Sequence, residues 1–205
     1  MTPEMLTALA TLGTVVVIGA SAIAALIQLR HMRASNELEA VLALQHDFQA
    51  PAMQAALEYV QRQLPAKLED EHYRQELAGI GFINVERHPE LMVCNWFTQM
   101  GTFLKHGLIT EATLMDLYAR MVRYYWTALS PMIAVMRRKR GDGQYAEFEY
   151  LALRANVWLA QYRSGVFPRG TARPPLADPW RGIDDGLDGR RSVALTDLVN
   201  LEQPR

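Results

Sequence analysis

The chain has 205 residues, of which 50% are apolar and 21% charged, and its formal net charge is −1. This balance excludes a strongly basic nucleic-acid-binding protein and an acidic disordered protein. We therefore expect no nucleic-acid partner.

The first element is a stretch from Met5 to Leu29 without a charged residue, followed closely by Arg30 and Arg33. A membrane-spanning helix needs about 20 apolar residues, whereas the apolar part of a signal peptide has about 7–15 and follows a basic start. The preceding MTPE carries no Lys or Arg. We expect a retained membrane anchor, rather than a cleaved signal or a soluble core helix, which would show a polar stripe.

The charges that follow the anchor predict its orientation. Lys and Arg are enriched on the cytoplasmic side of membrane helices. Arg30 and Arg33 therefore place the carboxyl-terminal side in the cytoplasm, and membrane lipid is an expected partner. The single cysteine, Cys94, fits a reducing compartment and equally a periplasmic domain without disulfides.

Small residues recur inside the expected span. Ala20 with Ala24, and Ser21 with Ala25, are pairs of small side chains four residues apart. Such pairs let two membrane helices approach closely. They predict a helix–helix contact in the membrane and hence a homo-oligomer.

Residues 34–164 are expected to form one helical domain after an anchor and juxtamembrane segment of residues 1–33. Helical spacing puts apolar residues on one face in five segments, which comprise Leu38, Val41, Leu42 and Phe48; Met53, Ala56, Leu57, Val60 and Leu64; Val93, Trp96, Phe97, Met100, Phe103 and Leu104; Leu114, Leu117, Tyr118, Met121, Val122, Tyr125 and Leu129; and Phe148, Leu151, Ala152, Ala155, Trp158, Leu159 and Tyr162. No run alternates as a strand would. The predicted fold class is all-α.

Several residues mark the ends of these helices. Thr110 is a plausible N-cap ahead of Glu111. Proline lacks the amide that bonds back one turn, so Pro131 should kink or restart the helix around it. The charged segment of residues 66–79 predicts a short helix on the surface.

Residues 165–205 form a tail rich in Gly and Pro, whose composition cannot form a core. A short helix is expected only at residues 192–202. There Leu195, Leu198 and Val199 share one face, as in a motif that docks on a partner protein. The alternative is a solvated tail with a chance apolar cluster.

Signatures of catalysis and metal binding are missing. The chain has no HExxH or CxxC pattern and only a single ExxH spacing, from Glu69 to His72, and its five histidines lie in separate segments. Zinc proteases and di-iron bundles depend on such spacings. We therefore expect no catalytic residue, no metal and no cofactor, and the chain is not predicted to be an enzyme.

A basic cluster ends one of the expected helices, and its members are Arg137, Arg138, Lys139 and Arg140. Cations at a helix C-terminus are ordinarily favourable because they complement the helix dipole. The alternative is contact with anionic lipid headgroups, shared with Arg30 and Arg33.

Three aromatic-rich segments, CNWFTQMGTF, VRYYWTALSPMIAVMRRKR and FEYLALRANVWLAQY, carry a family likeness. Over about residues 1–163 the chain resembles a family of bacterial single-span membrane proteins with a domain of unknown function. The resemblance implies a membrane helix before a small cytoplasmic helical domain, at the bacterial inner (plasma) membrane. Its motifs are packing residues and imply no catalytic role.

These observations predict a membrane-anchored interaction or scaffold protein, or an accessory subunit of a membrane complex, with a protein partner that the sequence does not identify. The alternative is a small-ligand sensor or enzyme with a pocket between helices, built from residues such as Glu86, His88 and Asn95. An open cavity that brings Asn95 together with a carboxylate or a histidine would favour the alternative, and a closed core would weaken it.

Overall fold

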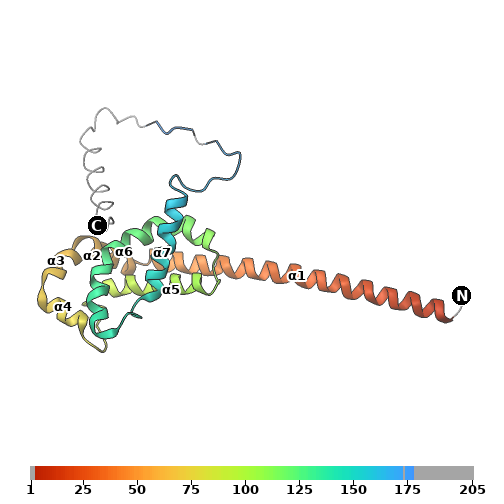
Figure 1. Ribbon diagram of the computed structural model, residues 1–205, viewed down its shortest axis with the longest axis horizontal. Coiled ribbons are helices and arrows are strands. Elements are labelled where there is room, and N and C mark those ends of the chain that lie inside the picture. The colour runs from red at the N-terminus through yellow and green to blue at the C-terminus, as the bar shows by residue number, and fades with distance from the viewer. Residues whose placement is uncertain (1–2, 173, 178–205) are drawn as a thin grey trace, which may run out of the picture. The chain divides into compact units, whose positions relative to one another are not determined.

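The computed structural model describes residues 3–172 and 174–177, and over these residues it contains helices and no strand. The predicted all-α class is therefore confirmed. The helices, labelled in Figure 1, are α1 (Pro3–Gln49), α2 (Pro51–Arg62), α3 (Leu64–Glu69), α4 (Glu71–Ala78), α5 (Glu90–Lys105), α6 (Glu111–Arg140) and α7 (Ala146–Gln161).

Helix α1 is continuous over 47 residues and hence about 70 Å long. Its N-terminal part runs clear of the other helices, and its last turns pack against them (Figure 1). Val41 and Leu44 are buried in the core, whereas Leu38 and Leu42 are 59% and 55% exposed. The single apolar face predicted here is wrong for Leu38 and Leu42, because the domain covers α1 on one side only and these two side chains point away from it.

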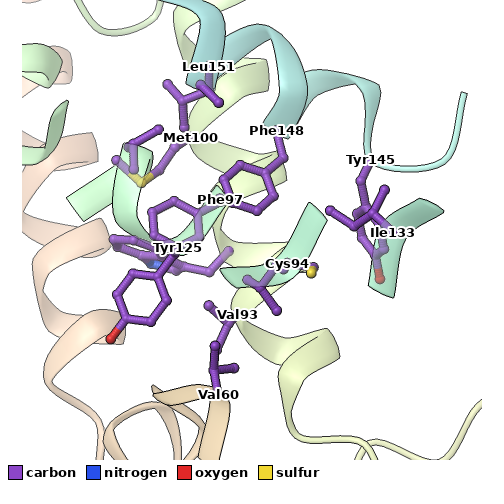
Figure 2. Packing of buried hydrophobic residues seen from close by; sticks show 14 of the residues in the cluster. Val60, Val93, Cys94, Phe97, Met100, Tyr125, Ile133, Tyr145, Phe148 and Leu151 are labelled. Atoms are coloured by element: carbon purple, nitrogen blue, oxygen red, sulfur yellow. The ribbon is translucent and has the colours of Figure 1, made fainter. Parts of the chain in front are cut away.

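The core of the domain lies between α5, α6 and α7. Phe97 of α5 stacks on Phe148 of α7, with ring centroids 4.7 Å apart, and Tyr125 of α6 lies 5.6 Å from Phe97 (Figure 2). The predicted faces of α5 and α7 supply these residues. Gly101 lets α5 and α7 approach closely, because a Cβ there would clash with the backbone of Glu147.

The predicted surface helix of residues 66–79 is wrong in two respects. The segment is divided between α3 and α4, because Asp70 caps α4 by accepting a hydrogen bond from the His72 amide at 2.9 Å. Tyr73 and Leu77 of α4 are buried. The many charges of the segment concealed these two core positions.

Helix α6 begins as the sequence predicts and continues further than expected. The Thr110 hydroxyl accepts a hydrogen bond from the Thr113 amide, which confirms Thr110 as the N-cap. The helix does not restart at Pro131 but runs through it to Arg140. Met132, Ile133, Val135 and Met136 are buried, so packing on both sides of Pro131 holds the helix together.

The chain divides into two compact units, Met1–Val166 and Phe167–Arg205. In the second unit the described residues include a turn in which the Thr171 amide donates to the Pro168 carbonyl at 3.1 Å. The predicted helix 192–202, with Leu195, Leu198 and Val199, lies outside the described residues.

Candidate functional site

A long run of exposed apolar side chains lies on α1. From Gly13 to Leu29 every side chain is exposed, and the large apolar side chains of this stretch are 51–64% exposed. An 18-residue window of α1 has a mean hydropathy of 1.7, so by length and composition α1 can cross a membrane. A soluble core helix would be buried, and this stretch is not.

The small residues predicted to mediate helix contacts lie on this surface. Ala20, Ser21, Ala24 and Ala25 are exposed along α1, in the part that runs clear of the domain. Arg30 directly follows the apolar stretch and is exposed as well. These residues are therefore accessible to lipid or to another helix.

Glu37 joins α1 to the start of α6. Its Oε1 accepts a hydrogen bond from the Thr110 amide at 2.9 Å. This bond, with smaller contributions from Thr113 and Arg33, lowers the pKa of Glu37 below its usual value. A carboxylate is favourable at a helix N-terminus, so the contact fixes α6 on α1 just beyond the apolar stretch.

The basic cluster lies at the other end of α6. Arg137 donates from Nε to the Gln144 carbonyl at 3.0 Å, and its Nη2 lies 2.7 Å from Glu149 Oε2 as an ion pair. Arg140 donates to the Gly79 carbonyl at 2.7 Å, whereas Arg138 and Lys139 are exposed.

These contacts give Arg137 and Arg140 structural roles within the domain. Helix α6 is about 45 Å long, so the basic end is remote from Thr110, where α6 meets α1. Of the cations predicted to meet lipid, Arg30 and Arg33 are the pair next to the apolar stretch.

The three residues of the predicted pocket are not assembled into one site. Asn95 is exposed and lines an open groove of about 310 Å³ together with Asp47 and Gln99. His88 is buried elsewhere, and Glu86 is exposed in the loop before α5. The open groove nevertheless pairs Asn95 with a carboxylate, which is the arrangement that favours a ligand site.

His88 belongs to a buried polar cluster that no sequence motif predicts. Tyr73 donates to Glu90 Oε1 at 2.6 Å, and His88 Nδ1 lies 2.9 Å from the same oxygen. His88 Nε2 lies 3.2 Å from Glu76 Oε2. Glu90 is fully buried, and its Oε2 has no hydrogen-bond partner.

The chemistry of this cluster is that of a closed structural site. Burial, and then the hydrogen bond to Glu90, raise the pKa of Tyr73 well above its usual value. Burial likewise raises the pKa of the Cys94 thiol, which has no exposed surface. Among the described residues no group of three or more His, Cys, Asp or Glu could hold a metal ion.

One weak signal could have led to the cluster. In the segment RHPE, Pro89 stands between His88 and Glu90 at the expected start of a helix. The segment does not reveal that Tyr73, from a helix that reads as charged, donates to Glu90.

The comparison with known families decides what the chain belongs to. The family described as a domain of unknown function, DUF4760, matches residues 15–155. The chain belongs to the DUF4760 family. No curated protein and no solved structure matches it. The DUF4760 match begins within the exposed part of α1 and ends within α7, so it contains the Glu37 contact and the Glu90 cluster.

Proposed function

We propose that this DUF4760 protein is a single-pass membrane protein that carries a helical interaction domain on the cytoplasmic side of the membrane. The observation that supports the proposal is the continuity of α1. One helix contains the exposed apolar stretch from Gly13 to Leu29 and also the buried anchors Val41 and Leu44. A membrane-held α1 would therefore carry the domain without a flexible linker.

The exposed apolar stretch accounts for the membrane. Burial of apolar surface is favourable by about 25 cal/mol per Å², and soluble monomers rarely expose large continuous apolar patches. From Met5 to Leu29 a helix is about 37 Å long, which exceeds the hydrocarbon layer of about 30 Å. Arg30 and Arg33, directly after this stretch, favour a cytoplasmic domain by the positive-inside rule.

Membrane extraction tests the proposal. We expect the full chain, including residues 5–29, to resist alkaline carbonate extraction and to show its full intact mass. Replacing Ile18 and Ile23 by arginine should release the protein from the membrane fraction, because each charge at the centre of a span costs about 2.5–3.5 kcal/mol.

The control for this experiment is Leu153→Arg. Leu153 lies on α7 and is 60% exposed, against 64% for Ile18 and 61% for Ile23. The control should stay in the membrane. A mature form that begins at Ile23 or later, or wild-type protein released by carbonate, would contradict the anchor.

A second candidate function, ligand sensing, is supported by the groove at Asn95. The groove has polar side chains from Asp47, Asn95 and Gln99 and an apolar wall that includes Met53 and Trp96. We expect its ligand to be a small molecule with hydrogen-bond donors for Asp47 and an apolar body.

Thermal unfolding tests the sensor function, because a ligand that binds only the folded state raises Tm. A compound with these features should raise the Tm of the full chain, and Asn95→Ala should remove the increase. The control is Asn36→Ala, at an exposed position of α1 outside the groove. If the increase persists in Asn95→Ala, the groove is not the binding site.

A further inference from the structure

A face of α1 beyond the apolar stretch has no partner in the described structure. Leu38 and Leu42 are 59% and 55% exposed, although they lie on the part of α1 that packs on the domain. Across a groove of about 550 Å³, which Gln45 and Gln49 line from α1, lies Leu117 of α6, 57% exposed. We call this surface, made of Leu38, Leu42, Gln45, Gln49 and Leu117, the Leu38 face.

We propose that the Leu38 face binds the same face of a second copy of this chain, in a parallel dimer. The inference rests on the proposed membrane anchor, because two copies held in one membrane have the same orientation. Equivalent residues of two such copies lie at the same height. A two-fold axis along the membrane normal then pairs each face with itself.

The periodicity of α1 links this face to the predicted membrane contact. Ala20 and Leu38 are 18 residues apart, as are Ala24 and Leu42. At 3.6 residues per turn this spacing is about five complete turns, so Ala20 is in line with Leu38 and Ala24 with Leu42, and the four side chains share one face of the helix. Small residues in the membrane and leucines outside it would therefore form one continuous contact between two α1 helices.

The distribution of charge on α1 suits a contact between identical surfaces. In a symmetric dimer a charge close to the axis meets its own copy and is repelled. At about 100° per residue, the charged residues that follow the apolar stretch lie at least about 80° from the midline between Leu38 and Leu42. They are Arg30, Arg33, Glu37, Glu39 and Asp47. The Leu38 face itself carries no Asp, Glu, Lys or Arg, and His31, neutral in the formal charge count, is the titratable side chain of α1 on the same midline.

Disulfide crosslinking of the full chain in lipid vesicles tests this arrangement. Single cysteines at Leu38 or Leu42 should form intermolecular disulfides at least about tenfold faster than cysteines at Asn36 or Ala43, because a disulfide needs Cβ atoms about 4 Å apart. Asn36 and Ala43 are exposed on α1 but point away from the Leu38 face. The native Cys94 is fully buried and does not compete.

A variant with charges on the Leu38 face tests how strongly this face stabilises the dimer. Leu38→Glu with Leu42→Glu should raise the dimer dissociation constant in vesicles by about 100-fold or more, because four apolar contacts per dimer are lost. The control is Leu153→Glu with Val157→Glu, whose side chains are 60% and 57% exposed on α7. The control should dimerise as the wild type does.

The outcomes separate this inference from the anchor. Flotation of the protein with the vesicles reports the anchor alone. Three results would overturn the dimer through the Leu38 face: the protein floats but stays monomeric, it crosslinks as fast through Asn36 as through Leu38, or only the α7 control loses the dimer. Protein that does not float overturns the anchor.

Discussion

Gly101→Ala should lower the free energy of unfolding by about 3 kcal/mol or more, although alanine is the better helix former by about 1 kcal/mol. The reason is the crossing of α5 and α7. An added Cβ would lie 2.6 Å from the Glu147 carbonyl carbon, and the backbone there cannot rotate away as a side chain would. Relief of this clash must separate the helices and disturb the stack of Phe97 on Phe148.

Urea unfolding of the full chain in nanodiscs, followed by tryptophan fluorescence, measures the effect. The matched control is Gly143→Ala, because a Cβ at Gly143 meets no atom within 4 Å. The control should change stability by no more than about 0.5 kcal/mol. Equal stability of the Gly101 variant and the wild type would show that α5 and α7 do not cross at this distance.

Tyr73→Phe should destabilise the domain by about 1.5–3 kcal/mol. The substitution removes the donor at 2.6 Å from Glu90 Oε1 in a fully buried site. Because Glu90 Oε2 already lacks a partner, the carboxyl group would then retain only His88. The control is Tyr150→Phe, at a side chain that is 37% exposed, with an expected change within about 0.5 kcal/mol.

A double-mutant cycle separates the hydrogen bond from packing. Glu90→Leu alone leaves Tyr73 and His88 without their buried acceptor, so it should cost more than Tyr73→Phe. The double variant should cost less than the sum of the two, because both ends of the Tyr73–Glu90 bond are then apolar. Strictly additive free energies of unfolding would contradict a direct Tyr73–Glu90 interaction.

Periodicity predicted most of the fold because local spacing and core burial agree in α2, α5 and α7. It failed where burial comes from another part of the chain. Leu38 and Val41 look equivalent along the sequence, and only the side of α1 that the domain covers makes one buried and the other exposed. Tyr73 was missed for the related reason that its partner Glu90 lies 17 residues away.

The candidate sites were less predictable than the fold. A run of four cations identifies a basic helix end, but the contacts of Arg137 with Glu149 and of Arg140 with the Gly79 carbonyl depend on tertiary structure. The apolar stretch of α1 was predictable because length and lack of charge are properties of the sequence itself.

The central claim is that α1 crosses the membrane and continues as one helix into a cytoplasmic domain. Labelling of single cysteines with a membrane-impermeant maleimide tests it most directly, and the buried Cys94 gives a low background. Cysteines at Val17 and Ile23 should stay unlabelled from both sides, and one at Asn36 should react only after the cells are opened. Labelling at Asn36 in intact cells, or at Ile23 from either side, would contradict the claim.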